Sequence, residues 1–270
     1  MPTIRDAVQE QFSAAAASYR TSPVHASGPD LEAIVQIVRR LPAPQVLDIG
    51  CGPGHVSINV APWAAHVVAC DLTERMLEQV ELFARERQIP NITTRQADVT
   101  RLPFADQQFD LVIARYCAHH WPQPLIALSE CRRVLRPDGL LLLSDSIAPE
   151  EPGLDTFLQT IEYLRDRSHV RNQSISQWCQ LCIEAGLTFT LIGNWPIPLE
   201  FAPWVQRIGT PAAHVATIRQ LFGEAAEEIR NAFALSEHTF TIPSALIQAC
   251  RPPESGACAP TGLTAGTLPG

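Results

Sequence analysis

Strand-like and helix-like segments alternate along the chain from residue 45 onward, and few architectures accommodate that order. The predicted strands, short runs rich in aliphatic or β-branched residues, span 45–49, 66–71, 92–98, 109–116 and 139–147. The predicted helices between them span 55–62, 73–88 and 123–135. This alternation is typical of a parallel sheet with helices packed on both of its faces.

The regular alternation of predicted strands and helices ends after residue 150, although two more strands are predicted. Helices are predicted near 154–167, from Ser176 and over 211–234, and strands over 187–192 and 238–251. The fold class that we expect is α/β: a Rossmann-like, doubly wound, mostly parallel sheet of seven strands, with helices on both faces.

The basic residues exclude several chemistries. All 20 of them are Arg, so the chain has no lysine for a Schiff base, a P-loop or a kinase site. The net charge is −8, and no Arg cluster is dense enough to neutralise a row of phosphates. We therefore expect a small-molecule partner and no nucleic acid. The sequence leaves the oligomeric state open.

The first residues and the cysteines indicate a soluble, cytoplasmic protein. Charges at positions 5, 6 and 10 interrupt the stretch that a signal peptide would keep apolar, and no apolar run of about 18 residues occurs elsewhere. The eight cysteines lie in apolar segments, as in a reducing compartment. Cys179 and Cys182 have the spacing of a metal site, but no second pair accompanies them. We expect them to pack in the core, and we expect no metal ion and no membrane span.

A glycine-rich turn follows the first predicted strand, where doubly wound sheets bind nucleotide-like ligands. Its glycines stand at 50, 52 and 54, whereas a nicotinamide-binding G-x-G-x-x-G turn would need a glycine at His55. Asp48, at the end of the strand, would repel a pyrophosphate but suits a ligand with an ammonium or sulfonium group. S-adenosylmethionine (SAM) carries both groups.

Acidic residues also end the next two predicted strands. Asp71 is placed to hold ribose hydroxyls, and the adjacent Leu72 to cover one face of an adenine. Asp98 ends the third strand, where its carboxylate would accept the adenine amino group while the Val99 N–H reaches a ring nitrogen. Three acidic strand ends in sequence order predict a SAM site more specifically than one glycine turn does.

These motifs resemble those of the class I SAM-dependent methyltransferases, in particular the quinone-biosynthesis (methyltransferase type 11) subgroup. VLDIGCGPGHVS is similar to the family's motif I, VVACDLTERML to its acidic loop, ADVTRLPFADQQFDLVIARYCAHHW to its motifs around strand four, and CRRVLRPDGLLLLSD to its turn into strand five. The resemblance covers roughly residues 10–250. It implies a SAM-dependent methyltransferase.

The domain organisation that we expect follows from this resemblance and from composition. Residues 1–40 would form an N-terminal helical lid and 41–150 the SAM-binding core. Residues 151–250 would form an acceptor-side insert and the closing strands of the same domain. Residues 251–270, rich in Pro and Gly, are expected to be a disordered tail.

The resemblance also implies a set of cofactor contacts. The glycines would let the backbone approach the methionine and ribose moieties, and Tyr19 with His25 would belong to a lid over the cofactor, unless Phe12 and Tyr19 merely pack a helix on the sheet. Arg115 would either meet a substrate carboxylate or brace the lid through an acidic partner. The expected cofactor-binding set is Asp48, Gly50, Cys51, Gly52, Gly54, Asp71, Leu72, Asp98, Val99, Arg115 and Tyr19.

The acceptor side is less defined. His119 and His120 follow the fourth strand and are candidate catalytic bases for a hydroxyl acceptor, unless they serve only as caps. The insert after residue 150 carries Trp178, Trp195, Phe201, Trp204 and Arg207, which either line a pocket for a flat apolar acceptor or pack the core.

The function we expect is methyl transfer from SAM to an O or C atom of a small, aromatic or quinol-like molecule. A SAM-binding protein without transferase activity is the alternative from another class. A nicotinamide-dependent oxidoreductase is less compatible, because the glycine spacing differs and no Lys is present.

Overall fold

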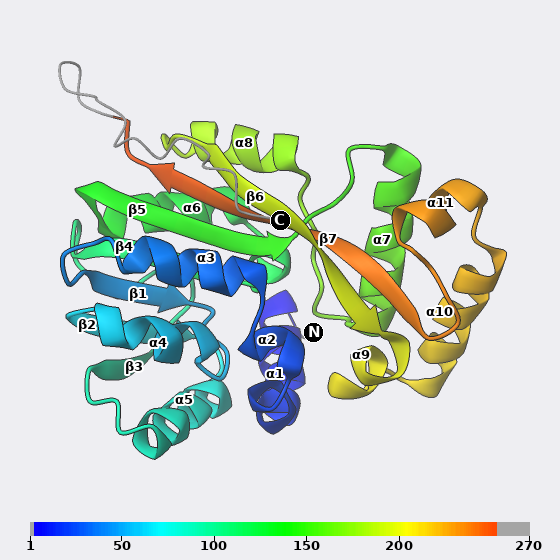
Figure 1. The fold of residues 1–270 in the computed structure, drawn as a ribbon, viewed down its shortest axis with the longest axis horizontal. Helices are drawn as coiled ribbons and strands as arrows, with labels where there is room; N and C mark the ends of the chain where they lie inside the picture. Colours follow the sequence, from blue (N-terminus) through cyan, green and yellow to red (C-terminus); the bar gives the residue numbers. More distant parts are fainter. Residues whose placement is uncertain (1–2, 253–270) are drawn as a thin grey trace.

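The computed structural model describes residues 3–252, and in them seven strands form one sheet (Figure 1). The strand order is β3-β2-β1-β4-β5-β7-β6, with β7 antiparallel to both neighbours. The doubly wound, mostly parallel sheet is therefore confirmed. From position 253 onward, the tail predicted at 251–270 lies outside the described residues. The strands are β1 (Gln45–Ile49), β2 (His66–Asp71), β3 (Ile92–Gln96), β4 (Phe109–Arg115), β5 (Leu135–Ser146), β6 (Thr190–Glu200) and β7 (Thr239–Cys250).

Helices cover both faces of the sheet, because alternate strand residues point to opposite faces and both sets are apolar. One face packs against α3 (Pro29–Val38), α4 (His55–Val60) and α5 (Glu74–Glu86). The other face packs against α6 (Pro124–Val134) and α8 (Ile175–Glu184), and Trp178 is buried there. The Trp178 side chain is therefore core.

The far ends of β6 and β7 extend beyond the main sheet and carry a smaller lobe (Figure 1). This lobe contains α7 (Pro152–Arg165), α9 (Phe201–Arg207), α10 (Ala212–Glu224) and α11 (Glu227–Ala232). Its apolar cluster includes Phe201 and Trp204, both 2% exposed, together with Phe240 from β7. Of the two interpretations of the aromatic insert, core packing is the one that the structure supports for Phe201 and Trp204.

Two elements of this region differ from the sequence prediction. The expected strand over 187–192 is instead β6, which runs through Pro196 and Pro198; an edge strand tolerates proline because its outer side has no ladder to complete. The expected helix over 211–234 is two helices. Arg230 donates to the carbonyl oxygens of Gly223 and Ala225 at the break, and Phe233 turns into the lobe's core.

The first two helices lie between the sheet and the smaller lobe (Figure 1). The long helix α1 (Ile4–Arg20) precedes the short α2 (Pro23–Ala26). The Gln9 side chain donates to the Leu72 carbonyl at 3.1 Å, and Gln11 donates to the Ile208 carbonyl at 2.5 Å, so α1 bridges the two parts. The expected lid at 1–40 needs correction, because Ile34 and Val38 of α3 are fully buried on the sheet; only α1 and α2 occupy a lid position.

Candidate active site

A cavity of ≈ 290 Å³ opens at the carboxyl ends of β1, β2 and β4, underneath α1. This volume is near the lower limit of the cavities that bind small ligands. The carboxyl edge is the place where a doubly wound sheet leaves a crevice, because its connections diverge there. Of the expected cofactor residues, it is lined by Tyr19, Gly50, Cys51, Gly52, Asp71, Leu72, Asp98, Val99 and Arg115.

The glycine turn forms the floor of this cavity. Gly50 and Gly52 have φ values of +60° and +51°, a left-handed conformation that glycine adopts without a Cβ clash. A Cβ on Gly52 would meet no atom within 4 Å, whereas one on Gly50 would stand 2.6 Å from the Cys117 Cβ. The backbone at Gly52 is therefore open to a ligand, and Gly50 is required by packing.

Asp71 stands over this turn with both carboxylate oxygens bound to the backbone. It accepts from the Gly52 N–H at 2.9 Å and from the Thr73 N–H at 2.8 Å. Burial raises the pKa of Asp71, and the hydrogen bonds from Thr73 and Gly52 oppose that rise. Asp71 thus fixes the glycine turn and retains lone pairs for a hydroxyl donor in the cavity.

Asp98 lies at the other end of the cavity, after β3. One of its oxygens accepts from the Thr100 N–H and hydroxyl at 2.7 and 2.8 Å. Its other oxygen forms an ion pair with Arg5 of α1. The lid helix is therefore held directly on a residue expected to contact the adenine.

The structure places Asp48 and Gly54 away from the cavity, which corrects their expected contact with a ligand. Asp48 is 1% exposed and accepts from the Ser57 N–H at 3.0 Å and the Ser57 hydroxyl at 2.6 Å. Burial raises its pKa to about 7, and its Oδ1 has no hydrogen-bond partner among the described residues. Gly54 has φ +94° and caps α4, with Val80 packed against it. Both residues therefore support the glycine turn and do not line the cavity.

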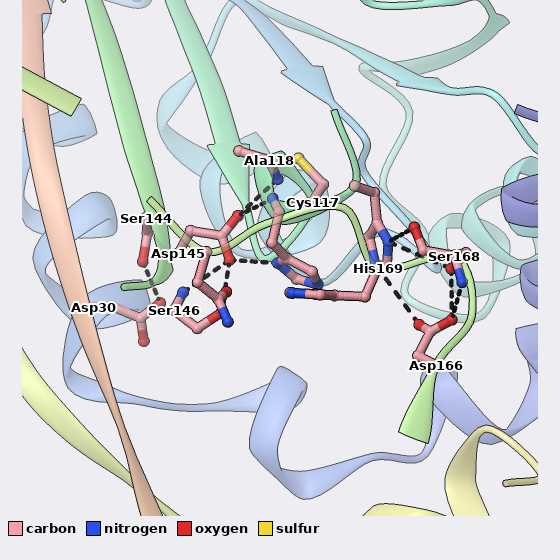
Figure 2. A network of polar contacts seen from close by, with 12 residues as sticks. Asp30, Cys117, Ala118, Ser144, Asp145, Ser146, Asp166, Ser168 and His169 are labelled. Atoms are coloured by element: carbon pink, nitrogen blue, oxygen red, sulfur yellow. Dashed lines mark hydrogen bonds and ion pairs between the residues drawn. The ribbon is translucent and has the colours of Figure 1, made fainter. Parts of the chain in front are cut away.

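Arg115 braces the lid. Its Nε donates to Asp30 at 2.5 Å and its Nη1 to the His25 carbonyl at 2.7 Å. Asp30 in turn accepts from the Ser144 hydroxyl at 2.9 Å, as Figure 2 shows. The sequence left two roles open for Arg115, contact with a substrate carboxylate or pairing with an acidic residue of the protein. The structure contains the second arrangement, with Asp30 as the acidic partner.

Several cavity residues were not identified from the sequence. Ile4, Val8 and Phe12 lie along one side of α1, and their four-residue spacing is the signal that would have indicated this face. Tyr116 also lines the cavity and has φ +52°. A left-handed conformation at a bulky residue is strained, and such strain concentrates at functional sites.

The two candidate histidines occupy different environments. His120 lines the cavity, with its ring centroid 4.9 Å from that of Phe12, whereas His119 does not line it. The His119 Nδ1 is 2.6 Å from the Asp145 Oδ1. Burial is the largest single effect and favours the neutral forms of this pair. The attraction between the two charges, their hydrogen bond and the neighbouring groups together outweigh it, so the pKa of His119 is raised and the pKa of Asp145 is lowered.

Asp145 also holds the turn that carries both histidines. Its Oδ2 accepts from the backbone N–H groups of Ala118 and His119, at 2.6 and 3.2 Å (Figure 2). His120 is held from the other side, where its Nδ1 donates to the Ser168 carbonyl at 3.0 Å. The turn is therefore clamped between β5 and the loop that follows α7.

Within residues 3–252, no helix is long and apolar enough to span a bilayer, and no group of His, Cys, Asp and Glu side chains is arranged to hold a metal ion.

Comparison with known proteins gives consistent results. Residues 47–143 match the family described as methyltransferase domain. The chain is 35% identical to the uncharacterized methyltransferase YcgJ of Bacillus subtilis over 243 residues, covering 88% of this chain and 96% of that protein. The crystal structure of YcgJ superimposes with a TM-score of 0.80 at 34% identity, over 83% of this chain and 99% of that one.

Two further relatives match shorter parts of the chain. The uncharacterized protein YafE of Escherichia coli is 44% identical over 191 residues, covering 71% of this chain and 92% of YafE. The demethylmenaquinone methyltransferase of Clavibacter sepedonicus is 28% identical over 171 residues, covering 61% of this chain and 64% of that enzyme.

Proposed function

The chain belongs to the class I SAM-dependent methyltransferases, and from this we propose that its cavity binds SAM next to a small, aromatic or quinol-like acceptor that is methylated on an O or C atom. The observation that carries this proposal is that Asp71 and Asp98 face one cavity across the open backbone of Gly52. Two carboxylates and an uncovered glycine are what a nucleoside with hydroxyl and amino donors requires.

The residues present fit SAM. Asp71 would hold the ribose hydroxyls and Asp98 with the Val99 N–H the adenine, while Leu72 and Met76 supply apolar contacts. Gly50, Cys51 and Gly52 would border the methionine part, with Tyr19 closing the cavity from α1. SAM, when bound, supplies an electrophilic methyl group on a sulfonium. The protein's contribution is to exclude water and to align the acceptor.

His120 is the proposed proton acceptor. A carbonyl oxygen can only accept, so the bond to Ser168 assigns the ring proton to Nδ1 and leaves the Nε2 lone pair free. Burial and the neighbouring His119 charge lower the pKa of His120 to about 4, so the ring is neutral at pH 7. Asp166 lies 4.0 Å from Nε2 and would stabilise a proton taken up there.

The acceptor class is inferred from the cavity walls and from one relative. Phe12, Tyr19, Tyr116 and Trp121 line the cavity and favour a flat, apolar ring. The name of the Clavibacter relative, a demethylmenaquinone methyltransferase, supports a quinol-like acceptor. A methyl-transfer assay with a panel of phenols and hydroquinones tests this, and transfer restricted to non-aromatic acceptors would overturn it.

Replacing Asp71 with Ala should weaken the binding of S-adenosylhomocysteine. The variant removes a charged acceptor from the ribose hydroxyls and the hydrogen bond that holds the Gly52 N–H of the glycine turn, an effect of about 1–3 kcal/mol. Isothermal calorimetry measures it, with the exposed Asp138→Ala as the matched control and NADH as the competing ligand. Binding of NADH in place of S-adenosylhomocysteine, or an unchanged affinity in Asp71→Ala, would count against the proposed cofactor site.

Replacing His120 with Ala should slow transfer to a phenol by about 10²-fold without changing the affinity for S-adenosylhomocysteine. The loss should shrink as pH rises toward the acceptor's own pKa, because the phenolate needs no base. A pH profile of kcat measures this, with the exposed His238→Ala as control. A deficit that is constant with pH would assign His120 to positioning alone.

A further inference from the structure

Arg5, in the first turn of α1, forms an ion pair with Asp98, the residue proposed to hold the adenine. Both side chains line the cavity. A capping box fixes this turn of the helix: the Asp6 N–H donates to the Thr3 hydroxyl at 3.2 Å, and the Thr3 N–H donates to the Asp6 carboxylate at 2.7 Å. The backbone that carries Arg5 is therefore held by its own hydrogen bonds where it meets Asp98.

The ion pair uses the oxygen of Asp98 that a ligand would need. Oδ1 already accepts two hydrogen bonds, from the Thr100 N–H at 2.7 Å and from the Thr100 hydroxyl at 2.8 Å. Oδ2 is the remaining oxygen, and the Arg5 guanidinium lies against it. Each carboxylate oxygen has two lone pairs, so an amino group reaches Oδ2 only beside the guanidinium or in its place. Arg5 and an adenine amino group therefore compete for one oxygen.

The rest of the first half of α1 lies over the same end of the cavity. Ile4 and Val8 line it, and the Gln9 side chain donates to the Leu72 carbonyl at 3.1 Å. Leu72 directly follows Asp71, the residue proposed to hold the ribose hydroxyls. The part of α1 that carries Arg5 therefore covers the part of the cavity proposed for the nucleoside.

The ion pair is weak enough to be reversible. The side chain of Arg5 is 53% exposed and that of Asp98 is 20% exposed. A pair with so exposed a partner changes an equilibrium constant by about fivefold at most, and the positive end of the α1 dipole adds a further attraction for the carboxylate. A ligand that has to displace such a contact loses affinity by the same factor.

We propose that Arg5 is an autoinhibitory contact, which competes with the adenine amino group of the cofactor for the Oδ2 atom of Asp98 and thereby sets the cofactor affinity. The inference rests on the proposed function, since it concerns the nucleoside end of that same cavity. When the cofactor binds, the half-exposed guanidinium moves from this oxygen into water, and the amino group takes its place.

Calorimetric titration with S-adenosylhomocysteine tests this proposal. Arg5→Gln should bind about two- to fivefold more tightly than the wild type, because no cation has to leave Asp98. Arg5→Lys keeps the positive charge and should gain less. Arg20→Gln is the matched control: it removes the ion pair with Glu86 at the other end of α1, and neither of these two residues lines the cavity. Its affinity should equal that of the wild type.

Two further titrations separate competition for Asp98 from a general loosening of α1. S-inosylhomocysteine carries an oxo group in place of the amino group, so it brings no donor to Asp98 and should gain nothing from Arg5→Gln. Raising the ionic strength from about 0.01 M to 1 M shortens the screening length from about 30 to 3 Å. The wild type should therefore bind S-adenosylhomocysteine more tightly at high salt, whereas Arg5→Gln should not.

The contrary outcomes are distinct. An unchanged affinity in Arg5→Gln overturns the proposal, and so does a weaker one, which would assign Arg5 to cofactor binding. An equal gain in Arg20→Gln, or an equal gain for both ligands in Arg5→Gln, overturns it as well, because loosening of α1 would then explain the result. In all of these cases the wild type still binds S-adenosylhomocysteine. Failure of the wild type to bind it would instead contradict the proposed function.

Discussion

Asp145→Asn should lower the free energy of unfolding by about 3 kcal/mol, the size of effect seen when one partner of a buried ion pair is removed. The Asp145 side chain is inaccessible to solvent and accepts from the His119 ring and from the backbone of Ala118, His119 and Ser146. An amide cannot accept at all of these positions, and the protonated His119 would lose its counterion.

The pH dependence of this loss has a defined sign. The pKa of Asp145 is lowered from 3.8, so its contribution is present above that pH and disappears as pH falls through the folded-state value. The pKa of His119 is raised from 6.5, so its contribution is present below that pH and disappears as pH rises through the folded-state value. The difference in unfolding free energy between the wild type and Asp145→Asn should therefore be largest between pH 3.8 and pH 6.5, where both contributions are present.

Urea unfolding at a series of pH values measures this prediction. The double variant Asp145→Asn/His119→Gln should lose less than the two single losses added together, because the two residues form one pair. A difference that grows as pH rises above 7, or strict additivity of the two substitutions, would contradict the role assigned to the pair. Turnover should fall as well, since this carboxylate holds the turn that carries His120.

Gly50→Ala should also be severely destabilising, by about 2–5 kcal/mol, the sum of left-handed backbone strain and overpacking. Gly50 has φ +60°, and its new Cβ would stand 2.6 Å from the Cβ and 2.7 Å from the Sγ of Cys117. Neither neighbouring atom can move freely, because Cys117 directly follows the strained Tyr116 on the exit from β4.

Gly52→Ala is the matched comparison. Its φ of +51° imposes similar strain, about 1–2 kcal/mol, but the new methyl group meets no protein atom within 4 Å. We expect a modest loss of stability and a large loss of S-adenosylhomocysteine affinity, because the methyl group occupies space at the cavity floor. Thermal unfolding and calorimetry on both variants separate the two effects.

The steric part of the Gly50 prediction can be tested by itself. The double variant Gly50→Ala/Cys117→Gly should recover part of the lost stability, since the clashing atoms are gone while the backbone strain remains. No recovery would show that the backbone conformation alone makes glycine necessary at position 50.

The sequence was sufficient for the main sheet because its strands are short runs rich in aliphatic or β-branched residues and bounded by turns. The same reasoning placed Asp71 and Asp98 in one cavity, since carboxyl ends of parallel strands meet at one edge of the sheet. It misplaced Asp48, because the last residues of a strand alternate in direction and only packing shows which side faces a ligand. The predicted helix over 211–234 likewise missed the break that buries Phe233.

The sequence by itself determined the sheet, the membership of the family and most of the residues proposed to hold the nucleoside, because these depend on local periodicity and on the order of strand ends. Only the tertiary structure decided that Arg115 is paired with Asp30 of α3 while it donates to the His25 carbonyl of α2, and that His120 and not His119 reaches the cavity. Each of these depends on a partner distant in the chain: 85 residues separate Asp30 from Arg115. Charge balance between such residues is a property of packing, and periodicity carries no information about it.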